Sequence, residues 1–227
     1  IGDCYAGSGR GGNPEPNTSK QDTNKGSLTV GVLYSKTTEE EKRQEAAATK
    51  KRNQALYDCW GLKPKDLVGL PWRLAFALQA DGWWIRSDVI WNKIDGFPEN
   101  VRDRPTKIHE YMFLLSKSKT YYYDYKAIQE PKWNSKEIEE EEMRNKRTVW
   151  SLSKGAKSSS THTATYPEAL VEPCILAGSR EGDIVLDPFV GSGTTGVVAM
   201  RLARRFIGIE LSPDSVAKAR ERLDQTV

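Results

Sequence analysis

The 227-residue chain has few cysteines and histidines and no long apolar run. The longest apolar stretches fall well short of the ~20 residues that cross a bilayer, so we expect no membrane partner. Its three cysteines, Cys4, Cys59 and Cys174, are far apart and never form a C-x-x-C pair. That spacing disfavours a disulfide framework or a zinc cluster, so we expect no metal site and a reducing, cytoplasmic location.

The charge balance permits a nucleic-acid partner without demanding one. The chain has 34 Lys and Arg against 31 Asp and Glu, a net charge of +3 and a pI near 8.6. Because affinity for phosphate depends on local basic patches, this small excess decides nothing by itself.

Large apolar residues gather in two blocks, at roughly 60–128 and 166–223. Two other segments, at about 8–58 and 132–160, are rich in Gly, Asn, Ser, Lys and Glu. Such segments bury too little apolar surface to offset the entropy lost on ordering. We therefore predict one domain over residues 1–227, with these two segments as polar, mobile insertions.

Hydrophobic periodicity predicts alternating helices and strands. The expected helices are Asp66–Gln79, Tyr166–Leu176, Thr194–Arg204 and Pro213–Leu223, the last capped by Ser212. The expected strands are Trp84–Trp91, Tyr111–Leu115, Ile184–Leu186 and Phe206–Glu210. This alternation predicts an α/β fold with a mostly parallel sheet and helices on both faces.

The pattern G-x-G-x-x-G occurs at Gly7–Gly12 and at Gly191–Gly196. Its mechanism requires a strand before it and a helix after it, and only the second copy has both. There the glycines let a ligand approach the backbone, and the helix N-terminus offers free N–H groups. Glu210, at the end of the next strand, is placed to accept hydrogen bonds from ribose hydroxyls. The spacing predicts an adenosine-containing cofactor.

The residue before the glycine loop distinguishes between cofactors. The carboxylate of Asp187 disfavours a pyrophosphate and favours an ammonium group. S-adenosylmethionine carries an ammonium and a sulfonium, whereas NAD carries two phosphates. An NAD-linked oxidoreductase, whose sheet would continue beyond Glu210, remains one alternative. A non-catalytic DNA-binding remnant is another.

The segment DPFVGSGTT, followed by a helix and FIGIE, resembles the cofactor motif of bacterial and phage DNA amino-methyltransferases. These are the N4-cytosine and N6-adenine enzymes of the permuted class, in which the catalytic motif precedes the cofactor motif. THTATYPEALVEPCILAGS resembles the family's helix-leading segment, and PWRLAFALQADGWWIRSDVIWNK and DRPTKIHEYMFLLSKSKTYYYD resemble middle segments of its phage-type members. The resemblance implies a Rossmann-like, S-adenosylmethionine-dependent methyltransferase fold.

The resemblance also implies a cofactor site, residue by residue. Asp187 would contact the amino group of S-adenosylmethionine, and Glu210 the ribose hydroxyls. The residues at its carboxylate and ribose would be Gly191, Ser192, Gly193, Thr194 and Thr195. Those flanking the adenine would be Phe189 and Leu211, and those near the methionine moiety His162, Thr163 and Thr165.

The family's catalytic motif, S/D-P-P-Y/W, is missing, because the sequence contains no Pro-Pro pair. The opening IGDCYAGSGRGG resembles the strand end that follows this motif, so we expect a chain that is incomplete at its N-terminus and inactive alone. No catalytic residue is assigned. The complete enzyme would flip a base out of double-stranded DNA and methylate its exocyclic amine. We slightly favour N4-cytosine over N6-adenine, and a restriction endonuclease is a possible partner.

Two other features have functional interpretations. The loop from Lys93 to Lys107 could bind DNA phosphates through Lys93, Arg102, Arg104 and Lys107. Its acidic residues leave open a merely solvated loop. Glu172-Pro173-Cys174 superficially offers the cysteine nucleophile of a C5-cytosine enzyme, but it lies inside an expected helix.

Overall fold

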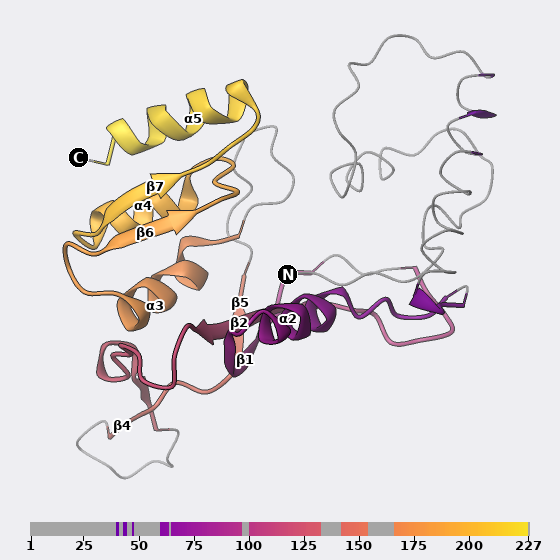
Figure 1. Ribbon diagram of the computed structural model, residues 1–227, viewed down its shortest axis with the longest axis horizontal. Coiled ribbons are helices and arrows are strands. Elements are labelled where there is room, and N and C mark those ends of the chain that lie inside the picture. The colour runs from indigo at the N-terminus through magenta and orange to yellow at the C-terminus, as the bar shows by residue number, and fades with distance from the viewer. Residues whose placement is uncertain are drawn as a thin grey trace. The chain divides into compact units, whose positions relative to one another are not determined.

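The computed structural model describes residues 40, 43, 44, 47, 60–63, 65–96, 100–132, 142–153 and 166–226 (Figure 1). The chain divides into two compact units, Ile1–Leu78 and Gln79–Val227. Apart from four residues, the insertion expected at 8–58 lies outside the described residues, as do 133–141 and 154–160 of the second insertion.

The described part of the first unit leads into helix α2, Leu70–Ala80. The sequence predicts a start at Asp66, and this is wrong by four residues. Gly69 has a φ of +69°, a left-handed conformation that cannot continue a right-handed helix. Asp66 instead closes a turn, with Oδ2 accepting the backbone N–H of Lys63 at 2.7 Å. The helix ends as expected before Gly82, whose N–H donates to Gln79 O at 3.0 Å.

In the second unit, β1 (Trp84–Lys93) lies between β2 (His109–Ser116) and β5 (Val149–Leu152). β1 and β2 are the two strands expected in this block, and they pair antiparallel. β5 pairs parallel to β1, with Trp91 opposite Trp150. These two tryptophans are buried together with Leu170.

β5 corrects the expectation of a polar insertion at 132–160. Trp150 is only 8% exposed, and its indole N–H donates to Arg147 O at 2.6 Å. Four residues, VWSL, are enough to pair with a neighbouring strand, but the charged residues around them dominate the average composition. A short 3-10 turn, Lys126–Ile128, and the small antiparallel pair β3 (Glu130–Pro131) and β4 (Met143–Arg144) complete this region.

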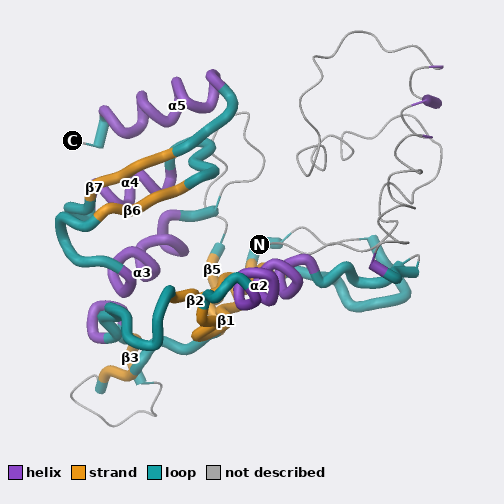
Figure 2. The backbone as a smooth tube through the Cα atoms, in the orientation of Figure 1, coloured by secondary structure: helices purple, strands orange, loops and turns teal. Residues whose placement is uncertain are grey.

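The C-terminal block contains α3 (Glu168–Gly178), β6 (Ile184–Asp187), α4 (Thr194–Arg201), β7 (Arg205–Gly208) and α5 (Pro213–Asp224) (Figure 2). All five elements are those predicted, although α4 ends three residues early and β7 ends two residues early. Ser212 caps α5 as expected, because its Oγ accepts the N–H of Ser215 at 3.4 Å.

The strands β6 and β7 are parallel, with Val185 opposite Phe206. These two side chains pack with Ile175 of α3 and Val198 of α4 in a second core cluster. On the other face, Ile184 and Leu186 remain 51% and 57% exposed. The described strand pairs are thus parallel at β1–β5 and β6–β7 and antiparallel at β1–β2 and β3–β4. Within the described ranges, no helix has the length and apolar character needed to cross a membrane.

Candidate cofactor-binding site

The glycine loop lies where the carboxyl ends of β6 and β7 meet. Backbone pairing continues past both strands: Ile209 N donates to Asp187 O at 2.9 Å, and Val190 N donates to Ile209 O at 3.0 Å. This pairing holds the segment after β6 beside the segment after β7. In open α/β sheets, ligands bind in the crevice outside the carboxyl ends of the strands.

The loop conformation depends on glycine at two positions. Gly191 has a φ of +52°, and Gly193, the N-cap of α4, has a φ of +86°. A Cβ on Gly193 would lie 3.3 Å from Cα and Cβ of Ala219 in α5. The loop therefore packs directly on α5. The first N–H groups of α4 have no acceptor within the helix, and they sit at the positive end of its dipole.

The carboxylate of Glu210 is fixed beside this loop. Its Oε2 accepts the N–H of Gly191 at 2.9 Å, and its Oε1 accepts the N–H groups of Leu211 and Ser212, each at 2.9 Å. Glu210 lies beyond the end of β7, in the turn that precedes α5. The position that the sequence predicts for a ribose-binding carboxylate thus faces the glycine loop.

Asp187, the last residue of β6, is at the centre of a second polar cluster. Its Oδ1 accepts the N–H of Phe189 at 2.9 Å. Its Oδ2 accepts the hydroxyl of Thr195 at 2.6 Å and lies 3.1 Å from the hydroxyl of Tyr166. The two hydroxyl oxygens are themselves 2.6 Å apart. The hydroxyls of Tyr166 and Thr195 carry one proton each, so two protons are shared among the three oxygen–oxygen contacts of this cluster.

Tyr166 is a site residue that the sequence interpretation missed. It lies two residues before the start of α3 and is half-buried against Asp187 and Thr195. Burial raises the pKa of its phenol, and the negative charge of Asp187 adds to this effect. The phenol therefore stays protonated and can donate a hydrogen bond. Its place in THTATYPEAL was a possible signal, but its partners 21 and 29 residues away could not be read from that segment.

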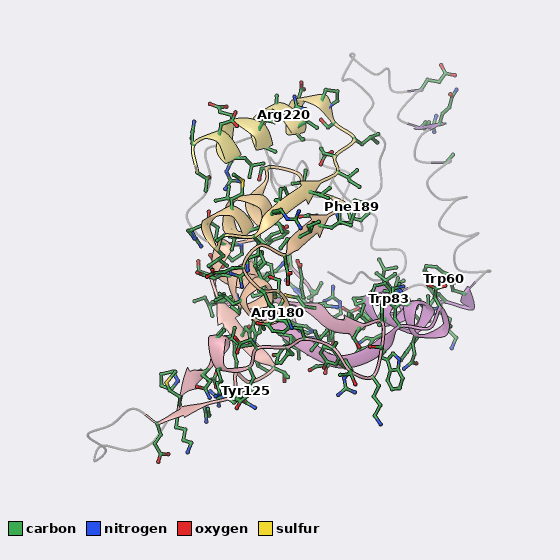
Figure 3. All side chains as sticks on the ribbon, turned by 60° about the vertical axis from the view of Figure 1, so that its left-hand side comes forward. Trp60, Trp83, Tyr125, Arg180, Phe189 and Arg220 are labelled. Atoms are coloured by element: carbon green, nitrogen blue, oxygen red, sulfur yellow. The ribbon has the colours of Figure 1, made fainter. Side chains whose placement is uncertain are left out.

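Two apolar side chains at the site project into solvent. Phe189 is 85% exposed and Leu211 is 95% exposed, and Phe189 stands at the loop that follows β6 (Figure 3). Both belong to the segments that Asp187 and Glu210 anchor, and both are available to contact a flat ring. The other predicted cofactor residues, His162, Thr163 and Thr165, lie outside the described residues.

The predicted DNA-binding residues differ in whether their charged groups already contact other parts of the chain. Lys93 forms an ion pair with Glu110 and lies 4.7 Å from the centre of the Trp91 ring. Lys107 Nζ lies 5.8 Å from the centre of the Tyr111 ring. In the same loop, Arg104 donates to Pro105 O at 3.2 Å, and Arg102 is exposed.

The cysteine chemistry considered above does not match the environment of Cys174. This residue lies inside α3, and its Sγ donates to Leu170 O at 3.4 Å. Although part of the residue faces solvent, burial of the thiol raises its pKa to about 11. A thiol in this state is a poor nucleophile near neutral pH. Within the described part of the chain, no three His, Cys, Asp or Glu side chains group as metal ligands.

Together, these features define an α/β fold with the strand–glycine loop–helix arrangement of Rossmann-like proteins. A glycine loop opens a helix, one carboxylate lies at the end of the preceding strand, and a second faces the loop from just beyond the next strand. The family model described as DNA methylase matches residues 22–221. The chain belongs to this DNA methylase family.

Curated relatives match 72% of this chain. The chain is 55% identical over 163 residues to the type II methyltransferase M.SmaI of Serratia marcescens. The matched stretch covers 72% of this chain and 54% of that protein. It is 53% identical over 163 residues to M.Cfr9I of Citrobacter freundii, again covering 72% of this chain and 52% of the relative. The chain thus spans about half the length of these relatives.

Solved structures share the fold. A crystal structure of the M1.HpyAVI–SAM complex matches with a TM-score of 0.54 and 28% identity, over 69% of this chain and 71% of that chain. The PvuII DNA methyltransferase, whose structure is titled as cytosine-N4-specific, matches with a TM-score of 0.58 and 21% identity, over 70% and 58% of the two chains. The second likeness supports the fold alone.

Proposed function

We propose that this chain is the cofactor-binding part of a DNA methyltransferase that transfers a methyl group from S-adenosylmethionine to an exocyclic amine of a DNA base. Membership of the DNA methylase family supports the reaction class. The observation that carries the choice of cofactor is the grouping of Asp187, the N-terminus of α4 and Glu210 at one edge of β6–β7.

Each group of this cofactor has a complementary partner at the site. The N-terminus of α4 suits the carboxylate of the methionine moiety, Asp187 suits the ammonium, and Glu210 suits the ribose hydroxyls. A carboxylate has about four acceptor positions. The contacts to Phe189, Thr195 and Tyr166 use three of those of Asp187, so one remains for the ammonium.

The carboxylate of Asp187 opposes a dinucleotide. A pyrophosphate at this loop would bring negative charge toward Asp187, and like charges ~4 Å apart repel by about 1 kcal/mol in water and about 4 kcal/mol near a protein surface. An NAD-linked oxidoreductase is therefore the weaker candidate.

The cofactor supplies an electrophilic methyl group, and the chain's own residues would bind and orient it. Accepting the target base and aiming its amine is the task of the S/D-P-P-Y/W motif, which these 227 residues do not contain. We therefore propose that this chain alone binds the cofactor without transferring the methyl group. N4-cytosine remains the slightly preferred target, from the resemblance of the middle segments to phage-type enzymes.

In the complete protein, we propose that the loop before β2 contributes to binding double-stranded DNA with the target base flipped out. The exposed guanidinium of Arg102 is the best candidate for a phosphate contact, because Lys93 is already paired with Glu110. Replacing one phosphate-contacting cation should weaken binding to all sequences alike and lower the salt slope by about 1.

Calorimetric titration of the chain with S-adenosylhomocysteine, and separately with NAD, tests the cofactor site. Glu210→Gln leaves an amide NH2 where an acceptor is needed, so it should weaken S-adenosylhomocysteine binding by about tenfold or more. Glu221→Gln, on the exposed face of α5, is the matched control and should bind like the unchanged chain. Binding of NAD without S-adenosylhomocysteine would overturn the proposal.

Incubation with methyl-labelled S-adenosylmethionine and mixed-sequence DNA, followed by nucleoside analysis, tests the chemistry. We expect cofactor retained on the protein and no labelled nucleoside from this chain alone. Label in N4-methylcytosine or N6-methyladenine would identify the target amine, and it would refute the proposed inactivity of the chain.

A further inference from the structure

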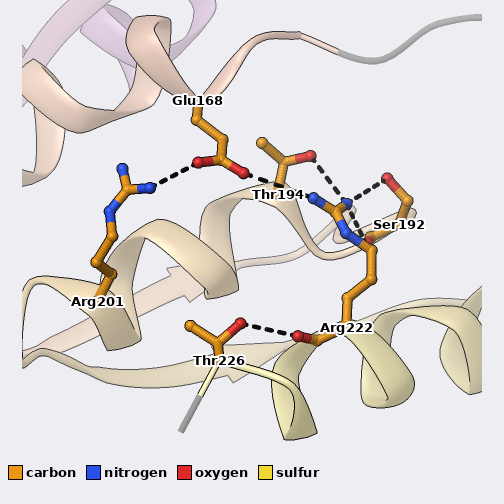
Figure 4. Close-up of polar contacts among 6 residues, drawn as sticks. All are labelled: Glu168, Ser192, Thr194, Arg201, Arg222 and Thr226. Carbon is orange, nitrogen blue, oxygen red and sulfur yellow. Dashed lines mark hydrogen bonds and ion pairs between the residues drawn. The ribbon is translucent and has the colours of Figure 1, made fainter. Parts of the chain in front are cut away.

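Arg222, in the last turn of α5, reaches across to the glycine loop. Its Nη1 donates to the backbone carbonyl of Ser192 at 2.7 Å. The same nitrogen lies 3.2 Å from Ser192 Oγ and 3.4 Å from Thr194 Oγ1. One guanidinium thus contacts both sides of Gly193, the residue at which the loop turns into α4 (Figure 4).

These contacts fix which way the loop faces. The carbonyl and hydroxyl of Ser192 both turn toward α5, and the buried hydroxyl of Thr194 does the same. The side chains of Ser192 and Thr194 are therefore engaged from α5. The N–H of Gly193, in the same peptide unit as the Ser192 carbonyl, donates to Val190 O at 2.9 Å. What this stretch offers to a ligand is therefore the N–H groups at the start of α4, whose direction follows from how the Ser192–Thr194 backbone is held.

A second contact orients the guanidinium itself. Nη2 of Arg222 lies 3.8 Å from Oε1 of Glu168, at the start of α3. The other oxygen of Glu168 accepts a hydrogen bond from Nη1 of Arg201 in α4 at 2.7 Å. Glu168 lies between the two arginines (Figure 4). The carboxylate of Glu168 thus connects α3, α4 and α5 behind the loop. Its negative charge holds the guanidinium of Arg222, whose side chain is partly exposed.

We propose that Arg222 is a positioning residue for the cofactor: its guanidinium holds the Ser192–Thr194 segment so that the N–H groups at the start of α4 face the methionine carboxylate. This inference rests on the proposed cofactor site. Arg222 acts through the loop and touches no part of the cofactor. Its loss should weaken recognition of the amino-acid end and leave recognition of the nucleoside end nearly intact.

The test compares two probes on matched arginine variants of the chain. S-adenosylhomocysteine carries the amino-acid end, and 5′-methylthioadenosine lacks it. In Arg222→Gln, the Kd for S-adenosylhomocysteine should rise about tenfold, equivalent to about 1.4 kcal/mol, while that for methylthioadenosine should stay within about twofold. Arg220→Gln, an exposed arginine one half-turn earlier on α5 (Figure 3), should change neither.

A lysine variant separates positioning from folding. Arg222→Lys keeps the positive charge near Glu168 but loses the fork of donors, so its Kd for S-adenosylhomocysteine should fall between those of the unchanged chain and Arg222→Gln. All titrations are made well below the thermal unfolding midpoint of each unliganded variant, so that loss of fold does not enter the Kd.

The outcomes distinguish this inference from the proposed function. If the unchanged chain binds S-adenosylhomocysteine and Arg222→Gln binds it as tightly as Arg220→Gln does, Arg222 does not position the loop. If both probes weaken equally in Arg222→Gln and Arg222→Lys, the effect is general, and the assignment to the amino-acid end is refuted. If the unchanged chain binds neither probe, the cofactor site itself is refuted.

Discussion

Gly196, in the first turn of α4, has less room for a side chain than any other described glycine. A Cβ there would lie 2.6 Å from Cε1 of Phe206 and 2.8 Å from Cδ2 of Leu223. The leucine methyl can rotate away, but the ring has little space to move. Its edge would also lie 2.9 Å from a Cβ on Gly208. Phe206 therefore occupies the space that two glycines leave open.

Two opposing effects decide the result of Gly196→Ala. Alanine favours the helix by about 1 kcal/mol over glycine. Overpacking a filled core costs about 1–3 kcal/mol, and the rigid ring places this site in the upper part of that range. We therefore expect a net loss of about 1–2 kcal/mol in the free energy of unfolding.

The matched control is Gly178→Ala at the end of α3. That glycine is exposed, its φ is not positive, and a Cβ there would meet nothing within 4 Å. Alanine should stabilise the chain there by about 0.5 kcal/mol, because only the helix preference and the unfolded-state entropy change. Urea unfolding of both variants gives the two free energies. If Gly196→Ala proves as stable as Gly178→Ala, the packing argument fails.

Three further predictions concern single side chains. Tyr166→Phe removes the phenol hydroxyl from Asp187 and should cost about 1 kcal/mol in thermal unfolding, with weaker S-adenosylhomocysteine binding. Cys174 should react with iodoacetamide at pH 8 about a hundredfold more slowly than an ordinary cysteine, because its pKa is about 11. Peptide-resolved mass spectrometry measures this rate, and fast alkylation would contradict the prediction. Burial and the neighbouring charge of Lys107 lower the pKa of His109 below 6.5, so the unfolded chain binds its proton first as the pH falls, and His109 should reduce stability progressively below pH 6.5. An NMR titration midpoint of 6.5 or above would refute this.

The elements that the sequence predicts well are those whose signals are local. The run IVL, the glycine loop and the following apolar helix lie within about twenty residues, and β6 and α4 begin where they were expected. The Ser212–Pro213 pair likewise marks the start of α5 to the residue. A cap, a left-handed glycine and a strand-to-helix switch each depend on near neighbours, so a single sequence contains the information.

The elements that it misses depend on distant partners. β5 exists because Val149 pairs with Ile90 along an edge of β1, and nothing in its own four residues specifies that edge. The start of α2 is missed for a different, local reason, because the left-handed conformation of Gly69 interrupts the helical pattern. The periodicity of the leucines does not detect this, since Leu67 keeps the helical spacing while lying outside the helix.

The glycine loop shows the same limit within the site itself. Resemblance assigns Ser192, Thr194 and Thr195 alike to the cofactor, because a motif treats its residues as one unit. Successive residues on a helix are about 100° apart, so Thr194 and Thr195 cannot share a direction. In the structure Thr195 faces Asp187, whereas Thr194 faces Arg222 together with Ser192. The motif thus combines two sets of side chains, one oriented toward the proposed ligand and one toward the helix behind the loop. Only the position of α5, specified 30 residues further along the chain, separates them.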